Sequence, residues 1–256
     1  MLQQIDIASV LFLDIETVSG AKSYADLDDN FKELWKYKAP SALRKPSSEL
    51  SEEDIENAYN EKAGIYSEFG KIICISVGIV VRDKNQQLSV RLKSFANDDE
   101  KIVLTEFAEL LNQYYQNPDK QYICGHNIKE FDIPYICRRM VIHQIPHPRM
   151  LQLQGKKPWE TKFLLDTLEL WKFGDMKNYT SLKLLAGVLG FPSPKDDIDG
   201  SEVGNVYWNL GDLPRIAIYC EKDVLATIQL LLKFMYMPTL EPNQVTSVGW
   251  KQEDDV

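Results

Sequence analysis

The strongest constraint on the fold is a short apolar run near the start of the chain that ends in two acids. The run is VLFLDI at residues 10–15, which is long enough for a buried strand. Its carboxylates are Asp14 and, directly after the run, Glu16. The two acids are two positions apart, so on a strand both side chains leave the same face. A pair of acids at a strand end is often simply solvated, but charged groups are uncommon at the end of a buried strand without a partner. We therefore expect the fold to supply a partner to this face.

The rest of the chain alternates between strand-like and helix-like segments. Short apolar runs predict strands at 72–81, 88–95 and 121–124. Periodic apolar stripes predict helices at 98–116, 133–143, 181–189 and 213–235. The stretch 164–170 fits either kind of element. Strands interleaved with helices predict an α/β fold in which a mixed sheet is flanked by helices.

Two stretches do not follow this alternation. Residues 19–70 separate the first two predicted strands, which a hairpin would join with only a few residues, and they carry two helical stripes. We interpret them as a helical insertion after the first strand, because the stretch is too short for a good core of its own. Residues 239–256 show no periodicity, so we expect a loosely held C-terminal tail. The predicted organisation is a single domain at 1–238 followed by this tail.

Composition excludes several classes of protein. Hydrophobic residues make up 44% of the chain, enough for a sizeable core, but no window approaches the roughly 18 uncharged apolar residues of a membrane helix. The first residues, MLQQIDIASV, lack the pattern of a signal peptide. The four cysteines form no CxxC pair, which is typical of reduced thiols in a cytoplasmic protein. We therefore expect a cytoplasmic protein with no membrane partner.

The net charge of −9 argues against tight binding of long duplexes through many phosphates. Basic residues nevertheless gather in two places. One group contains Arg138, Arg139, Arg149, Lys156 and Lys157. The other, within the insertion, contains Lys32, Lys36, Lys38, Arg44 and Lys45. Each group is either a contact for nucleic-acid phosphates or an ordinary solvated surface. We expect the insertion to border the site and to contact substrate phosphates through some of its five basic residues.

Two further acids complete a pattern with the first pair. Asp132 is placed where a loop enters a predicted helix, where its ordinary role would be to cap that helix. Tyr219 and Asp223 are four positions apart and so share one helix face. Four ionised carboxylates cannot crowd together without cations. Hard divalent ions prefer such oxygen ligands, and a pair of them hydrolyses phosphodiester bonds by activating water and neutralising phosphoryl charge.

Three fragments give this pattern a family resemblance. FLDIET, GHNIKEFDIP and YCEKDV resemble the three exonuclease motifs of the DEDD superfamily of 3′–5′ exonucleases, and the tyrosine four residues before the last aspartate resembles its tyrosine branch. FGKIICISVG and LGFPSPKDDIDGSEV resemble the proofreading domains of family-B DNA polymerases. Within that group, the chain is most similar to stand-alone predicted exonucleases related to those domains. The resemblance covers residues 8–235 approximately.

The resemblance implies a ribonuclease-H-like fold, two divalent cations (magnesium or manganese), and release of 5′-mononucleotides from a 3′ end. The metal ligands that it implies are Asp14, Glu16, Asp132 and Asp223. Tyr219 would orient the attacking water, because an unperturbed tyrosine pKa of about 10 makes it a poor base at neutral pH. Residues near the bound strand would be Thr17, Val18, Asn127 and Phe131.

The predicted function is therefore hydrolysis of single-stranded DNA from its 3′ end by a two-metal exonuclease. An exoribonuclease or oligonucleotidase of the same fold remains an alternative, because the sequence does not reveal how the site treats a 2′-OH. A nucleic-acid-binding module without catalysis is a second alternative, although such a module would be expected to have lost at least one of the acids. No polymerase segment follows the last predicted helix, so we expect any polymerase or repair partner to be a separate protein.

Overall fold

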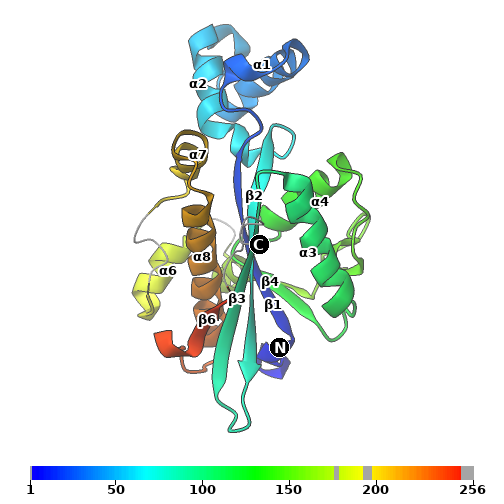
Figure 1. Ribbon diagram of the computed structural model, residues 1–256, viewed down its shortest axis with the longest axis vertical. Helices are drawn as coiled ribbons and strands as arrows, with labels where there is room; N and C mark the ends of the chain where they lie inside the picture. Colours follow the sequence, from blue (N-terminus) through cyan, green and yellow to red (C-terminus); the bar gives the residue numbers. More distant parts are fainter. Residues whose placement is uncertain (1, 176–178, 193–197, 249–256) are drawn as a thin grey trace, which may run out of the picture.

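A six-stranded mixed sheet forms the centre of the computed structural model, which describes residues 2–175, 179–192 and 198–248. Figure 1 shows helices on both sides of this sheet. In spatial order the strands are β5 (Leu164–Asp166), β4 (Tyr122–Gly125), β1 (Val10–Ser19), β2 (Gly70–Arg82), β3 (Leu88–Ala96) and β6 (Val245–Ser247). Strand β1 pairs parallel with β4 and antiparallel with β2, so it is interior, as predicted. The expected α/β fold, a mixed sheet flanked by helices, is confirmed.

Strand β1 is buried on both faces, and its alternation decides where the acids lie. Leu11, Leu13 and Ile15 belong to the core cluster under α3 (Glu100–Tyr114) and α4 (Asp132–Ile142). Val10 and Phe12 belong to the cluster under α8 (Leu213–Phe234). Since successive side chains alternate, Asp14 and Glu16 share the α8 side with Phe12. The pairing of β1 with β2 shifts register between Glu16 and Thr17, an irregularity of the kind that often re-aims side chains beside active sites.

Helix α8 is the main cover of the second face. It contacts β1, β2 and β3 along its length, and α6 (Leu182–Leu189) packs on its outer side. A short helix, α7 (Val203–Asn205), and one π-turn at Val206–Leu210 lead into α8. The ambiguous stretch 164–170 divides into strand β5 and the start of α5 (Thr167–Lys172). None of the helices described is both long and apolar enough to cross a membrane.

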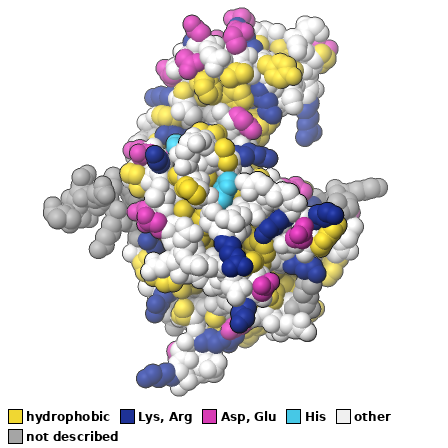
Figure 2. Space-filling view, turned by 90° about the vertical axis from the view of Figure 1, so that its right-hand side faces the viewer, with side chains coloured by type: hydrophobic (Ala, Val, Ile, Leu, Met, Phe, Trp, Pro, Cys, Tyr) yellow, Lys and Arg dark blue, Asp and Glu magenta, His cyan; other side chains and the backbone are white. Residues whose placement is uncertain are grey.

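The helical insertion lies beyond the ends of β1 and β2, at the top of Figure 1 and again at the top of the space-filling view in Figure 2. It contains α1 (Asp29–Leu43), α2 (Glu52–Lys62) and short 3₁₀ turns at Tyr24–Asp26, Ser47–Glu49 and Ala63–Ile65. We expected too little chain here for a good core, yet a compact aromatic cluster is present. The ring of Trp35, fully buried, lies 5.3 Å from Tyr59 and 5.0 Å from Phe69. Edge-to-face aromatic pairs of this kind let a small helical pair hold together.

The start of the predicted tail is more ordered than its sequence suggested. Val245–Ser247 forms β6, which pairs parallel with β3. Gln229 on α8 exchanges two hydrogen bonds with the backbone of Leu240. These contacts use backbone groups, so they leave no apolar periodicity in the sequence. The remainder of the predicted tail, 249–256, lies outside the described residues, as does 193–197 within the stretch LGFPSPKDDIDGSEV.

Candidate active site

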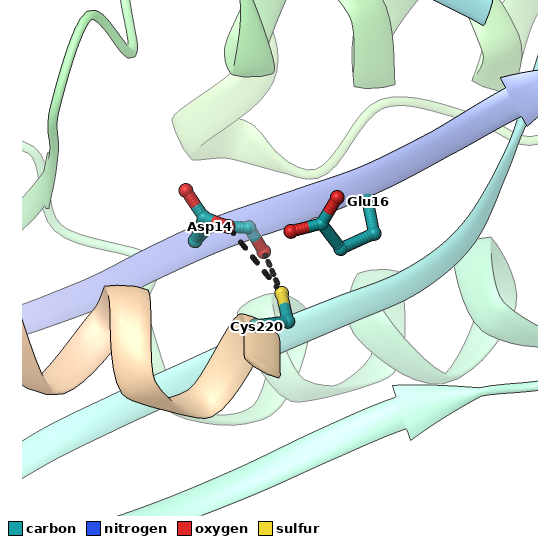
Figure 3. A group of neighbouring side chains, drawn as sticks. All are labelled: Asp14, Glu16 and Cys220. Atoms are coloured by element: carbon teal, nitrogen blue, oxygen red, sulfur yellow. Dashed lines mark hydrogen bonds between the residues drawn. The ribbon is translucent and has the colours of Figure 1, made fainter. Parts of the chain in front are cut away.

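The acids of β1 meet helix α8 at the middle of the sheet. Figure 3 shows Asp14 and Glu16 on β1 and Cys220 on α8, pointing toward one another. One ligand atom from each of the three residues lies within 4.8 Å of the others. Glu16 and Cys220 are buried, and Asp14 is partly buried. The sequence placed both acids on one strand face, and the structure brings them together there.

Asp132 reaches the same place from the opposite layer. It is the first residue of α4 and is buried. Its Oδ1 accepts a hydrogen bond of 3.2 Å from the backbone N–H of Ile15, the residue between the two β1 acids. The N-cap residue of α4 is Phe131, so Asp132 contacts β1 and does not take the ordinary role of a helix cap. The hydrogen bond fixes the start of α4 beside Asp14 and Glu16.

Helix α8 brings Tyr219 and Asp223 to the acids. The two side chains hydrogen-bond to each other, as expected from their spacing of four residues. Burial raises the pKa of Tyr219 above its ordinary range, and the nearby negative charges of Asp223, Glu16 and Asp14 raise it further. The hydroxyl therefore stays protonated at neutral pH and serves as a hydrogen-bond donor.

Burial of the carboxylates, together with their mutual repulsion, is the main electrostatic feature of the site. Burial raises the pKa of Asp14 well above its ordinary value, and the charges of the three other predicted acids raise it further. Burial also raises the pKa of Asp132 to about 7, with additional contributions from Asp166 and Asp223. All four predicted acids are thus close enough to interact. Divalent cations fit this donor set, because the oxygens are hard ligands and positive charge relieves the repulsion.

Two buried side chains that the sequence did not single out organise the acids. The Sγ of Cys220 lies 3.4 Å from the backbone oxygen of Asp14 and 3.5 Å from its Oδ2. Burial raises the pKa of Cys220 well above its ordinary value, so the group remains a thiol and donates to Asp14. Its one sequence signal is its place inside YCEKD, on the turn of α8 that faces β1.

Asp166, at the end of β5, is the second of these side chains. Its carboxylate accepts hydrogen bonds from the backbone N–H groups of Asn127 at 3.0 Å and Lys129 at 3.1 Å. It also caps α5 by accepting from Leu168 and Glu169. Asp166 therefore holds the loop that leads to Asp132. The ambiguous pattern at 164–170 gave no signal of this role.

A cleft of about 820 Å³ opens beside Glu16. Thr17, Val18 and Phe131, expected near the substrate, line it. Asn127 does not; it lies in the left-handed region with a φ of 63° and donates to Asp166. The opposite wall comes from the insertion and from the segment before α8. Its lining residues are Lys22, Ser23, Asn60, Glu61, Lys62, Gly64, Ile65, Gly200, Ser201, Gly204, Asn205, Trp208 and Asn209.

The insertion borders the cleft as predicted, but not through the predicted basic group. None of its five members lines the cleft within the described residues. Lys36 lies 3.3 Å from Glu33 and 3.9 Å from Glu52, while Lys38 lies 4.3 Å above the ring of Tyr66. Neighbouring acids and rings on the insertion engage these cations. The insertion presents Lys22 and Lys62 to the cleft instead.

Trp208 is a further cleft residue that sequence reasoning missed. It lies on the π-turn before α8, and its Nε1 donates a hydrogen bond of 3.1 Å to the Oγ of Ser19 at the end of β1. Its ring meets that of Tyr207 edge to face at 4.9 Å. A π-turn has no distinctive sequence pattern, although such turns are frequent at functional sites.

Comparison with known proteins places the chain beside a family of exonucleases and a solved polymerase structure. Residues 65–251 match the family model described as "Predicted 3'-5' exonuclease related to the exonuclease domain of PolB". The fold is similar to the structure of the family B DNA polymerase from the hyperthermophilic archaeon Pyrobaculum calidifontis, with a TM-score of 0.53 and 16% identity. That similarity covers 89% of this chain and 24% of the polymerase chain, so the chain spans about a quarter of that protein. No curated protein sequence matches significantly.

Proposed function

We propose, since the chain belongs to the family of predicted 3′–5′ exonucleases related to the exonuclease domain of PolB, that it removes nucleotides from the 3′ end of single-stranded DNA. The products would be 5′-mononucleotides. The observation that carries the proposal is the meeting of Asp14, Glu16 and Asp132 with Asp223 and its hydrogen-bonded tyrosine, beside an open cleft. Binding alone does not require such mutually repelling acids.

The proposed cofactors are two divalent cations, magnesium or manganese. Asp14, Glu16, Asp132 and Asp223 would hold them. When bound, such ions acidify water and neutralise charge on the phosphoryl oxygens. The four acids already interact with one another, which supports a shared site rather than separate ones.

The raised pKa of Tyr219 limits the role that this residue can have. Burial and the surrounding acids raise its pKa, so the phenol does not act as a base at neutral pH. It can donate a hydrogen bond and so orient the attacking water or a phosphate oxygen. Asp132 serves a second purpose, because its bond to the Ile15 N–H keeps α4 against β1. Cys220 steadies Asp14 in the same way from α8.

The cleft supports a single strand as substrate. Its volume of about 820 Å³ falls in the range of small-ligand sites, which suits one or two nucleotides and not a duplex. Thr17, Val18 and Phe131 are the proposed contacts of the terminal nucleotide, with Trp208 on the opposite wall. The proposed role of Asn127 is indirect: its N–H donates to Asp166, which holds the loop before Asp132.

We also propose the setting in which the enzyme acts. Residues 1–238 would form one exonuclease domain, with the helical insertion at 19–70 as part of it. The four cysteines are all free, which suits a cytoplasmic location. The family's relation to a polymerase exonuclease domain suits a separate polymerase or repair protein as partner.

A digestion panel tests the proposal. Oligonucleotides labelled at the 3′ or 5′ end, as single-stranded DNA, duplex DNA and RNA, are incubated with magnesium, manganese or EDTA. We expect mononucleotide release from the 3′ end of single-stranded DNA with either metal and none with EDTA. Faster cleavage of RNA would favour the exoribonuclease alternative. Binding without cleavage under every metal condition would favour a silent module and overturn the proposal.

A further inference from the structure

An exposed tryptophan stands among lysines on the segment that leads into β5. Trp159 is 62% exposed, so a large part of its ring is open to a ligand. The Nζ of Lys157 lies 5.0 Å from the centre of that ring, and the Nζ of Lys156 lies 5.4 Å from the ring of Phe163. Lys162 is also exposed. We call these residues, Lys156, Lys157, Trp159 and Lys162, the Trp159 platform.

The platform's lysines contact rings at most, so their charges are not neutralised by a carboxylate. Within the described residues, none of its three lysines makes a salt bridge, whereas Lys36, Lys129 and Arg139 all do. The acid inside the segment, Glu160, accepts the backbone N–H of Lys157 at 2.8 Å and thus caps its own turn. In a chain of net charge −9, an exposed ring with unpaired lysines is a local positive site.

One β-strand, β5, connects the platform to the candidate active site. Residues 164–166 form β5, whose last residue, Asp166, holds the loop before Asp132 and raises the pKa of that acid. Trp159 and Asp166 are seven positions apart in the chain, so their Cα atoms are at most about 25 Å apart. At the stacked spacing of about 3.4 Å per nucleotide, that distance corresponds to no more than about seven nucleotides.

We propose that the Trp159 platform is a second contact for the single strand whose 3′ end lies in the cleft. A base stacks on the free face of Trp159, and the lysines contact the neighbouring phosphates. Aromatic rings beside cations bind single strands in this way, because every base offers a flat face. The proposal rests on the proposed exonuclease function. The platform adds to that function a binding site outside the cleft, which makes the affinity depend on the length of the bound strand.

Single-stranded nucleic acid fits the platform better than a protein does. Pro158 and Glu160 flank Trp159 in the sequence, and Trp159 is the one exposed large hydrophobic residue between positions 143 and 172. The exposed apolar area of this segment is therefore one ring and not the broad patch of a protein interface. A duplex keeps its bases stacked on each other and would leave Trp159 unused. The geometry therefore points to unpaired bases upstream of the 3′ end.

The experiment measures binding without turnover. The fluorescence anisotropy of 5′-labelled oligo(dT) is followed in EDTA for a short strand of about 3 nucleotides and a long strand of about 20, lengths below and above the range of typical single-strand sites. Wild type should bind the long strand more tightly. Trp159→Ala should weaken long-strand binding by about 5- to 150-fold, as expected for one stacked base, and leave short-strand binding unchanged.

Matched variants separate stacking from general damage. Trp159→Phe should restore most of the long-strand affinity, because a ring is present again. Tyr37→Ala removes an aromatic side chain that is 89% exposed on α1 and outside the cleft, and it should have no effect. The double variant Lys156→Ala, Lys157→Ala should make the plot of log affinity against log salt concentration less steep, by about 1 to 2 in slope.

Two results would overturn the proposal. The first is equal long-strand affinity in Trp159→Ala and wild type. The second is a loss that is the same for both lengths. Cleavage of the short strand with magnesium is assayed in parallel and reports on the proposed function alone. An enzyme that cleaves short strands but shows no length-dependent loss in Trp159→Ala retains its proposed function and refutes the platform.

Discussion

Replacing Asp166 by alanine tests how the site is held together. The carboxylate accepts two backbone N–H groups from the loop before Asp132 and two from the start of α5. Losing the helix cap costs about 1 kcal/mol. Leaving the two half-buried loop donors unpaired costs about 1 kcal/mol each, at the lower end of the range for buried groups. Relief of repulsion with Asp132 offsets part of this loss, so we expect a decrease of about 2–3 kcal/mol in the free energy of unfolding.

The matched variant is Asp166→Asn, which keeps an acceptor oxygen. Its amide oxygen can occupy the position of Oδ1, which receives three of the four bonds, while the bond from Lys129 to Oδ2 is lost. We expect a decrease of about 1 kcal/mol, the typical value of one hydrogen bond. Urea unfolding followed by circular dichroism gives both values, and single-turnover cleavage shows whether the loop still presents Asp132.

Two measured outcomes would contradict this role of Asp166. An Asp166→Ala variant less than about 0.5 kcal/mol below wild type, the range of ordinary surface substitutions, would mean that water replaces the carboxylate at no cost. An Asn variant as unstable as the Ala variant would mean that charge, and not the acceptor, is what the loop needs. The first outcome would remove Asp166 from the account of how the acids are placed, and the second would replace its role as a hydrogen-bond acceptor with one that depends on its charge.

Further predictions concern the acids, the phenol and a buried histidine. Asp14→Ala, Asp132→Ala and Asp223→Ala should each abolish single-turnover cleavage, because each removes part of one shared charge site; near-wild-type rates in any of them would contradict the metal assignment. Tyr219→Phe should lower the rate by about 10²–10⁴-fold, the range for an oriented proton-handling group, and complete loss would show a larger role. Burial lowers the pKa of His126, so the unfolded chain takes up a proton first as pH falls. The stability that depends on His126 is therefore present above about pH 6.5 and is lost as the pH falls through the pKa of the folded state. A plot of melting temperature against pH should show this loss, and His126→Gln should make that plot flatter.

The sequence predicted those parts of the molecule that depend on local pattern. The run 10–15 carries its own evidence of burial, so β1 and its paired acids could be placed on an interior strand. The spacing of Tyr219 and Asp223 likewise gave a shared helix face without any knowledge of the sheet. What the sequence could not give was the partner of each acid. The bond from Ile15 N–H to Asp132 joins residues that are 117 positions apart.

The missed features share a physical cause. Asp166 acts by accepting backbone N–H groups, Cys220 by one thiol contact, and β6 by backbone pairing with β3. None of these interactions leaves a periodic or compositional trace. The basic group of the insertion was misplaced for a related reason, since nearby acids and rings engage part of it. Counting charges along the chain does not reveal which of them are already paired.

The two ends of the helical insertion face each other across a pair of strands. Ser19 on β1 is the register partner of Gly70 on β2, and the N–H of Gly20 donates to Phe69 O at 2.7 Å. The insertion is therefore an exchangeable module on a narrow neck, because chain ends this close can be joined by a short turn. It forms one wall of the cleft, whereas Asp14, Asp132 and Asp223 belong to the sheet and its covering helices. The width of the cleft and the placement of the acids can therefore change independently in this fold. Shortening the insertion would widen the cleft and leave these three acids in place.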